Sequence, residues 1–400
     1  MDTQEIMARG QAFLAGTYGR APVAFTRGAG TRLWDSDGRE YLDFVSGIAV
    51  CNVGHCHPKV VAAIQEQAQR LLHVSNLYYI EPQVRLARWL AEHSFADKSF
   101  FCNSGAEAIE AALKLARRHA ATRCGPQRHE VVCMENSFHG RTFGALSATM
   151  QPKYQEGFQP LVPGFVSVPF NDLPALERAV TERTCAVLLE PIQGAGGVNV
   201  PDRGYLAAVR RVCDERGALL IFDEIQTGLG RTGTLFAYED EGVEPDIMAL
   251  AKGLAGGVPM GAMLARDEVM AAFTPGSHAS TFGGNPLASA AAFATVSVIE
   301  EEHLVEHGRK VGAYFAAGLE RLGEYFPRLG RVRGRGLLLG LELPVEGAPA
   351  VDACRQRGFL INCIKGSVLR FLPPLLIQEQ EVEALLTCLH EVFTELDGLR

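Results

Sequence analysis

The chain lacks the features that mark nucleic-acid-binding and membrane-spanning proteins. Lys and Arg total 38 against 46 Asp and Glu, so the formal net charge is −8 and the isoelectric point lies near 5.8. A phosphate-binding surface would need an excess of clustered basic residues. The N-terminus has no apolar signal core, and the apolar stretch 290–299 is too short to span a bilayer. We therefore expect a cytoplasmic protein that binds small molecules or protein, with no nucleic acid and no membrane.

Paired cysteines, repeats and low-complexity linkers are also missing. Ten cysteines are scattered singly, which indicates free thiols in a reducing compartment. Cys51, His55, Cys56 and His57 could be drawn as a zinc site, but no C-x₂-C pair or second ligand cluster accompanies them. We therefore expect no metal, and any domain boundary should fall within continuous structure.

Helical and strand-like patterns alternate through the middle of the chain. Short continuous apolar runs, typical of buried strands, are separated by amphipathic segments with helical spacing. This α/β alternation predicts a mostly parallel sheet covered by helices on both faces. The expected helices are 57–72, 83–93, 106–120 and 205–215, and the expected strands are 99–102, 130–134, 186–190, 219–222 and 246–251. With 400 residues and 47% hydrophobic content, the chain can bury a core of that kind.

The two chain ends have a different pattern. Asn285 and Pro286 open a long helical stretch that we expect to bend between 301 and 307. Short strands are expected within 25–44 and at 336–343, 358–364 and 368–377, and a last helix is expected at 379–393. We predict a large domain at 55–299 and a smaller α+β domain built from 1–54 and 300–400.

Polar residues follow each expected strand of the large domain. Ligands of open parallel sheets bind outside the carboxyl ends of the strands, so these groups should line one cleft. The groups are Asn103 to Ala106, Glu135 to Arg141, Glu190 to Gln193, Asp223 with Glu224 and Gln226, and Lys252.

Three of these groups have distinct chemistry. Ser104, Gly105 and Ala106 open a helix, whose first N–H groups would bind an anion, although an ordinary serine cap explains the same residues. Lys252 follows an apolar run and precedes glycines. If it is desolvated, its amine becomes neutral and able to form a Schiff base, whereas a solvated loop lysine is the simpler alternative. Asp223 ends a strand and could also cap a turn.

Together the three groups predict pyridoxal phosphate as the cofactor: a lysine for the aldehyde, a helix N-terminus for the phosphate, and an acid that keeps the pyridine nitrogen protonated. A rival interpretation comes from GLGRTG at 228–233, which matches a dinucleotide-binding fingerprint. That fingerprint requires a helix opening on the glycines, and TLFAYEDEGVEPD leaves little room for one. A nicotinamide-dependent oxidoreductase is therefore disfavoured. A non-catalytic binding protein is also disfavoured, because Lys252, Asp223 and the arginine pair Arg141 and Arg370 are all present.

The chain resembles the class III pyridoxal-phosphate aminotransferases nearly end to end, most closely their acetylornithine branch. The motifs that carry the resemblance are NVGHCHP, HVSNLYY, FCNSGAEAIEAALKLAR, NSFHGRTFGALSAT, LLEPIQG, LLIFDEIQTGLGRTG, AKGLAGG, HASTFGGNPLA and VLRFLPPL. The resemblance implies fold type I and a homodimer with the site at the subunit interface.

The resemblance also implies roles for individual residues. Lys252 would hold the cofactor and shuttle a proton, and Asp223 would pair with the ring nitrogen. Gln226 would approach the ring hydroxyl, and Phe138 and Ile225 would enclose the ring. The remaining implied cofactor contacts are Ser104, Gly105, Ala106, His139, Glu224 and, from the other subunit, Thr281.

Two arginines would bind the substrate carboxylates. Arg141 would be the distal clamp and Arg370 the proximal one, because bidentate pairing suits carboxylates at two distances. Glu190 would neutralise Arg370 when no proximal carboxylate is present. Tyr18 and Ser280 complete the implied substrate contacts.

The implied reaction transfers the δ-amino group of N2-acetylornithine to 2-oxoglutarate, giving N-acetylglutamate 5-semialdehyde and glutamate in arginine biosynthesis. Ornithine, succinylornithine, acetyl-lysine or 4-aminobutyrate transamination stays open, because one methylene or acyl group gives little discrimination. A class III aminomutase is a further alternative. Two departures bear on the substrate: Ala195 stands where the family commonly has Glu, and Ala279 where it commonly has Gly.

Overall fold

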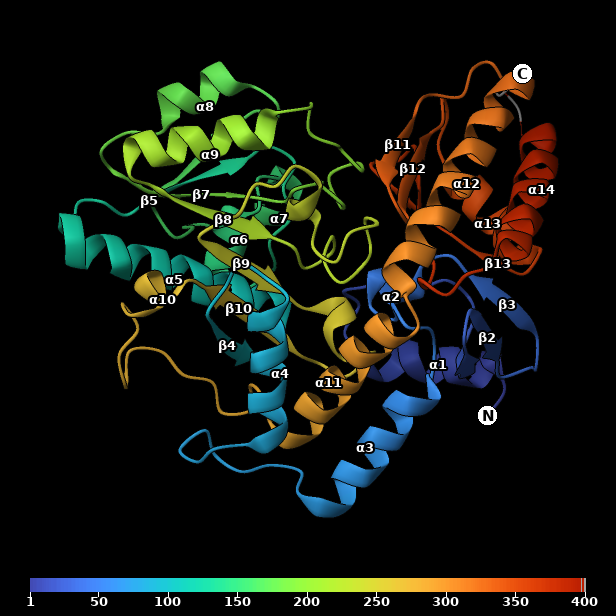
Figure 1. Cartoon of the computed structure of the whole chain (residues 1–400). Helices are drawn as coiled ribbons and strands as arrows, with labels where there is room; N and C mark the ends of the chain where they lie inside the picture. Colours follow the sequence, from blue (N-terminus) through green and yellow to red (C-terminus); the bar gives the residue numbers. More distant parts are fainter. Residues whose placement is uncertain (397, 399–400) are drawn as a thin grey trace.

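The computed structural model of the protein describes residues 1–396 and 398 (Figure 1). Its largest element is a seven-stranded sheet with the order β4-β10-β9-β8-β7-β5-β6. The strands are β4 (Lys98–Cys102), β5 (Glu130–Met134), β6 (Phe165–Val168), β7 (Thr184–Leu189), β8 (Leu219–Asp223), β9 (Ile247–Leu250) and β10 (Gly261–Ala265). All five strands expected in this region are therefore present.

Strand β10 is the one antiparallel member of this sheet. It pairs antiparallel with both β4 and β9, while the pairs among β9, β8, β7, β5 and β6 are parallel. The sequence patterns did not identify β10 or β6. The prediction of a mostly parallel sheet is confirmed, with β10 as the exception.

The sheet is buried on both faces, which explains why its strands are continuously apolar. Along β8, Leu220 and Phe222 pack in one core cluster and Ile221 packs in the other. Along β9, Met248 and Ala249 divide between the clusters in the same way. Successive side chains of a strand point to opposite faces, so two covered faces require an apolar residue at every position.

Helices supply the two covers. In Figure 1, α5 (Gly105–Cys124) lies on one side of the sheet and α8 (Leu173–Ala179) and α9 (Tyr205–Arg216) lie on the other. The remaining helices around this sheet are α3 (Pro58–Arg70), α4 (Glu81–Glu92), α6 (Phe143–Ala148), α7 (Pro152–Gln155), α10 (Asp267–Met270) and α11 (Pro286–Glu301), with short 3₁₀ turns η1 (Ala237–Asp240) and η2 (Lys252–Ala255).

Two four-stranded sheets involve the chain ends, with the orders β1-β2-β3-β13 and β11-β12-β15-β14. Because β13 pairs in parallel with β3, residues near 359 lie beside residues near 42. The elements are α1 (Thr3–Phe13), β1 (Phe25–Ala29), β2 (Arg32–Asp35), β3 (Glu40–Asp43), α2 (Ser46–Ala49), α12 (Leu304–Tyr325), β11 (Val332–Arg335), β12 (Leu338–Glu342), α13 (Ala348–Gln356), β13 (Phe359–Leu360), β14 (Asn362–Ile364), β15 (Val368–Phe371) and α14 (Glu379–Glu395). The domain boundaries near 55 and 299 stay a prediction.

The long helical stretch after Asn285 breaks where a bend was expected. Helix α11 ends at Glu301, α12 begins at Leu304, and His303 between them has a left-handed φ of 51°. The side chain of Asn285 accepts a hydrogen bond from the N–H of Ala288, as an N-cap does.

The glycine stretch 228–233 is not followed by a helix that opens on it. Only the four-residue turn η1 follows before β9, so the dinucleotide-binding geometry is absent from this part of the described chain. Across the described residues, no helix is both long and apolar enough to cross a membrane.

The histidines of the sequence cluster near residue 55 have protein partners. The Nε2 atom of His55 lies 2.7 Å from a carboxylate oxygen of Asp43, and that of His57 lies 3.2 Å from Glu302. Among the residues that the structure describes, no group of three or more His, Cys, Asp or Glu side chains is arranged to hold a metal ion.

Candidate functional site

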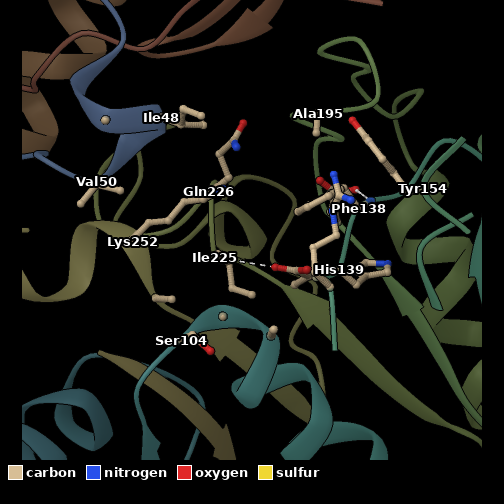
Figure 2. A pocket seen from close by; sticks show the side chains of 18 of the residues that line it. Ile48, Val50, Ser104, Phe138, His139, Tyr154, Ala195, Ile225, Gln226 and Lys252 are labelled. Carbon is tan, nitrogen blue, oxygen red and sulfur yellow. Dashed lines mark hydrogen bonds and ion pairs between the residues drawn. The ribbon is translucent and has the colours of Figure 1, made fainter. Parts of the chain in front are cut away.

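A cavity of 1170 Å³ lies at the carboxyl ends of the parallel strands. Its wall contains residues that follow β4, β5, β7, β8 and β9, so the five predicted groups do converge. Figure 2 shows Lys252 and Gln226 on one side of the cavity, Phe138 and His139 on the other, and Ser104 below them at the start of α5. The predicted site residues that line it are Tyr18, Ser104, Gly105, Ala106, Phe138, His139, Arg141, Glu190, Asp223, Ile225, Gln226, Lys252 and Arg370.

Asp223 is held as a buried acid at the end of β8. Its Oδ2 lies 2.7 Å from Nδ1 of His139, and its Oδ1 accepts a hydrogen bond from the N–H of Ile225 at 3.0 Å. Both side chains of the His139–Asp223 pair are almost fully buried. These contacts fix the direction of the carboxylate, which faces the cavity as an acceptor with lone pairs to spare.

Lys252 begins the turn η2 directly after β9. Its φ of 41° lies in the left-handed region, which a residue with a Cβ rarely adopts. Within the described chain, its Nζ makes no hydrogen bond or ion pair of its own. Burial, reinforced by the nearby Arg370 guanidinium, lowers the pKa of Lys252 to about 8, although Asp223 and Glu190 act in the opposite direction. A substantial fraction of this amine is therefore neutral in mildly alkaline solution.

The N-terminus of α5 offers free backbone donors to the cavity. The hydroxyl of Ser104 accepts from the N–H of Glu107 at 3.2 Å, so the ordinary capping role is real. The N–H groups of Gly105 and Ala106 have no protein acceptor in the described chain, as expected of the first turn of a helix. The serine cap and an anion site at this helix end are thus compatible, and the cap leaves two donors for an anion.

The backbone near this helix end is closely packed. A Cβ added at Gly105 would come within 2.8 Å of Ile225, and one added at Gly140 would come within 2.8 Å of the Cβ of Ala106. Gly140 also has a φ of 136°, which disfavours any other residue. The small residues of the motifs therefore allow Ile225 and the 138–141 segment to approach the helix N-terminus.

Arg141 and Arg370 reach the cavity from different elements. The guanidinium of Arg141 lies 4.1 Å from the ring centroid of Tyr154, in a cation–π contact. Arg370 lies in β15, where Nη1 donates to Oε1 of Gln226 at 3.4 Å and Nε donates to Oδ1 of Asn362 at 3.3 Å. Burial lowers the pKa of Arg370 to about 10, an effect that Glu190 opposes.

The expected ion pair between Glu190 and Arg370 is not formed in this structure. The two carboxylate oxygens of Glu190 instead accept from the N–H of Phe138 at 3.1 Å and that of Gly194 at 3.2 Å. Burial raises the pKa of Glu190, with Asp223 adding to the shift and His139 opposing it. Glu190 therefore acts on Arg370 through space, while two amide oxygens take the guanidinium hydrogen bonds.

Three predicted residues do not line the cavity of this chain. The carboxylate of Glu224 accepts from the hydroxyl of Thr227 and from the N–H groups of Ala237 and Tyr238, so it organises the loop after β8 and does not face a ligand. Its place beside Asp223 in the sequence suggested a shared role, but the two side chains leave the backbone in different directions.

The other two are Ser280 and Thr281. The Ser280 hydroxyl accepts from the side chain of Asn103 at 3.3 Å and from the N–H of Gly283 at 3.0 Å, and Thr281 is exposed. Asn103 itself lines the cavity, so this loop lies close to the site without entering it.

Several lining residues were missed by the sequence analysis. They come from loops and from the four-residue helices α2 and α7, which are too short to show a period, and the pairing of Tyr154 with Arg141 has no signal in the spacing. The missed residues include Ile48, Val50, Lys153, Tyr154, Met260 and Lys365. Ala195, one of the two departures from the family pattern, also lines the cavity.

Among the described residues, the site combines a buried acid, an amine without a partner, and two free N–H donors at a helix end. These groups fit a ring with a basic nitrogen, an aldehyde and a phosphate, which are the reactive parts of pyridoxal phosphate. Lys252, Asp223 and the Gly105–Ala106 backbone are the residues that would hold it.

Comparisons with known proteins agree with this chemistry. A family model described as aminotransferase class-III matches residues 13–393. An acetylornithine aminotransferase of Methanocaldococcus jannaschii is 52% identical over 381 residues, which cover 95% of each chain. One from Gloeobacter violaceus is 54% identical over 382 residues, again 95% of each chain.

Solved structures are similar over the same extent. The ornithine aminotransferase of Toxoplasma gondii ME49 superposes with a TM-score of 0.96 at 37% identity, covering 100% of this chain and 97% of that one. The acetylornithine aminotransferase of Elizabethkingia anophelis superposes with a TM-score of 0.89 at 33% identity, covering 99% and 100%.

Proposed function

Because the chain belongs to the class III aminotransferases, we propose that it is a pyridoxal-phosphate-dependent enzyme that transfers the δ-amino group of N2-acetylornithine to 2-oxoglutarate. The products are N-acetylglutamate 5-semialdehyde and glutamate. The observation that carries the proposal is the convergence of Lys252, Asp223, the N-terminus of α5 and two arginines on one cavity. The names of the relatives at 52% and 54% identity favour acetylornithine as the amino donor.

The buried residues account for the proton chemistry. When bound, the cofactor supplies an aldehyde and a cationic ring that accepts electrons from the substrate. Asp223 would hold the proton on the ring nitrogen, and the 2.7 Å contact with His139 fixes the orientation of its carboxylate. The amine of Lys252, with its lowered pKa, is partly neutral and can take a proton from the reacting substrate carbon and return it.

The two arginines separate the two substrates by the position of their carboxylates. N2-acetylornithine reacts at its terminal amine, so its carboxylate is remote and reaches Arg141. Glutamate reacts next to one carboxylate and has a second at a distance, so it engages Arg370 as well as Arg141. One cavity can therefore serve both halves of a ping-pong reaction.

A homodimer belongs to the same proposal. Two segments, 71–80 and 273–285, meet where the side chain of Asn76 donates to the carbonyls of Ser280 and Gly283. They carry unusually exposed apolar side chains: Leu77 is 85% exposed, Tyr79 99% and Phe282 60%. A surface of this kind on a monomer marks an interface, and we assign it to a second copy, into whose site Thr281 would reach.

We also propose a cytoplasmic location and a role in arginine biosynthesis. All ten cysteines are free, and two of them, Cys56 and Cys124, are exposed. Exposed free thiols are typical of a reducing compartment. The pathway follows from the acylated donor, since an acyl group keeps the α-amine of ornithine out of the reaction.

Ornithine is the second candidate donor, favoured by the TM-score of 0.96 to an ornithine aminotransferase. A stopped-flow panel would rank N2-acetylornithine, ornithine, succinylornithine, acetyl-lysine and 4-aminobutyrate by the rate at which each changes the visible absorption of the bound cofactor. We expect acetylornithine to react fastest, and a faster reaction with free ornithine would replace it. In Lys252→Ala the absorption due to the lysine-bound cofactor should be lost, and borohydride should no longer fix the cofactor to the chain.

A further inference from the structure

Arg231 is the largest fully buried side chain of the described protein, and it forms no ion pair there. Its guanidinium donates to the carbonyls of Leu337 and Pro373 and, at 2.7 Å, to Oδ1 of Asn52. Burial lowers the pKa of Arg231 to about 9. A buried cation without a carboxylate partner is costly. Its three neutral acceptors belong to three separate segments of the chain, and Arg231 therefore links these segments.

Asn52 is fixed from several directions. Its side-chain Nδ2 donates to the carbonyl of Leu229 at 3.0 Å, and its Oδ1 receives the hydrogen bond from Arg231. Its own carbonyl accepts from the N–H of Leu375 at 2.8 Å. Only 1% of the surface of Asn52 is exposed, so packing and these hydrogen bonds together fix the orientation of its side chain.

The amide of Asn52 packs directly on Gly253, the residue after Lys252. A Cβ added at Gly253 would lie 2.5 Å from Nδ2 and 2.8 Å from Cγ of Asn52. Gly253 is not among the residues with a left-handed φ, so its backbone would accept alanine. The obstacle to a side chain at 253 is therefore Asn52 and not the local conformation.

We propose that Arg231 and Asn52 are positioning residues: they hold Gly253, and through it the strained backbone of Lys252, at a fixed place relative to Arg370. The connection to Arg370 runs along the chain, because Pro373, whose carbonyl accepts from Arg231, follows Arg370 by three positions. A left-handed backbone at a non-glycine residue persists only when its surroundings enforce it. Asn52, held by Arg231, supplies that enforcement. The inference rests on the proposed role of Lys252.

The pKa of the Lys252 amine depends on where the amine lies. The charged groups that act on it are Arg370, Asp223 and Glu190, and burial and Arg370 together keep its pKa low. If the backbone of Lys252 relaxes, the amine moves away from this environment and its pKa rises toward that of an ordinary lysine. A change in the pKa of Lys252 therefore distinguishes a positioning role of Arg231 and Asn52 from a merely structural one.

The test is competitive acetylation of the full chain, freed of cofactor, with acetic anhydride over a range of pH. Mass spectrometry of the peptide containing Lys252 gives the midpoint of its reactivity, with surface lysines as internal references. Gly253→Ala should raise this midpoint by about one pH unit. Asn52→Ala removes the enforcing side chain and should raise the midpoint as well. In the double variant Asn52→Ala/Gly253→Ala the shift should be smaller than the sum of the two single shifts, because the shortened side chain makes room for the new methyl group.

Two further variants complete the design. Gly318→Ala is the matched control, since its new methyl group would meet Leu386 of α14, and it should leave the midpoint unchanged. Arg231→Lys keeps the charge but has a single nitrogen, which cannot take the places of both Nη1 and Nη2, so it should raise the midpoint as well. Arg231→Lys also provides the test if Gly253→Ala does not fold.

An unchanged midpoint in Gly253→Ala or in Arg231→Lys would overturn the proposal. So would a double variant that shifts as far as the sum of its single changes, because the contact between Asn52 and residue 253 would then carry no coupling. The readout involves neither substrate nor cofactor. A protein that proved inactive with acetylornithine would therefore refute the proposed function without affecting this result.

Discussion

Arg370→Ala should damage the two halves of the reaction unequally. In the proposed assignment the guanidinium meets the carboxylate that lies next to the reacting amine of glutamate, and N2-acetylornithine has no carboxylate at that place. Arg370 is 3% exposed, and its structural contacts are two neutral amide oxygens, of Gln226 and Asn362. Its loss should therefore affect glutamate directly and acetylornithine only through small rearrangements.

The size of the difference follows from the burial of the site. Truncating one partner of a buried, hydrogen-bonded charge pair costs about 2–5 kcal/mol. At about 1.4 kcal/mol for each factor of ten, the glutamate half-reaction should slow by roughly 30-fold to several thousand-fold in kcat/KM. The two amide oxygens that lose their donor make weaker, neutral hydrogen bonds, each worth about 1 kcal/mol. Two such bonds amount to about 2 kcal/mol, so the acetylornithine half-reaction should lose at most about 30-fold, and the glutamate half-reaction should bear this loss in addition to its own.

Single-turnover stopped-flow measurements resolve the halves, because each substrate alone converts the cofactor once. Arg141→Ala is the control: both substrates carry a distal carboxylate, so it should slow both halves by similar factors. Equal losses in both halves for Arg370→Ala would refute the assignment of the proximal carboxylate to Arg370. Equal losses for Arg141→Ala, by contrast, are the expected result.

Two other predictions concern assembly and pH. Leu77→Asp/Tyr79→Asp should shift the protein from dimer to monomer in light scattering and remove activity, and an active monomer would show that the site is complete in one chain. Glu224 has a pKa raised by burial to about 7, so its contribution to stability is full below its unfolded value near 4.5 and is lost as the pH rises through 7. Glu224→Gln should lack this dependence: relative to the unmodified protein, its free energy of unfolding should rise by up to ~3 kcal/mol between pH 4.5 and pH 7. Denaturant titrations would contradict the reasoning if the difference in free energy of unfolding between the two proteins stayed constant over this pH range.

The sequence predicts the large sheet well because both of its faces are buried. Burial on two sides demands continuous apolar runs, and these are visible at β5, β7, β8 and β9 without any knowledge of their partners. Strand β10 has the same composition, yet its antiparallel direction depends on its neighbours β4 and β9, and local pattern contains no information about neighbours. Helix ends were predictable for the same local reason, as at Asn285, whose cap is formed by residues three positions apart.

The residues of the site were likewise predictable only in part. Residues at strand ends, such as Asp223 and Lys252, were predictable because topology brings all carboxyl ends to one edge. Contacts between separate short segments were not predictable: Tyr154 meets Arg141, and Asn52 meets Gly253, across sequence separations that no period describes. Glu224 shows the converse error, since adjacency to Asp223 in sequence did not place its side chain in the cavity.

The state of Glu190 bears on how one cavity accepts two substrates. Both of its carboxylate oxygens are occupied by backbone N–H groups, so pairing with Arg370 would require at least one of those hydrogen bonds to be exchanged. Without substrate, the Arg370 guanidinium donates hydrogen bonds to the amide oxygens of Gln226 and Asn362, and no carboxylate among the described residues contacts it directly. A proximal carboxylate would meet an arginine already held in place, which reduces the cost of ordering it on binding. A donor without that carboxylate need only leave the two amide contacts intact. In the proposed assignment, the neutral partners of Arg370 would allow one cavity to accept both substrates without a movement of Glu190, and Gln226 and Asn362 would contribute to the discrimination as well as the acid.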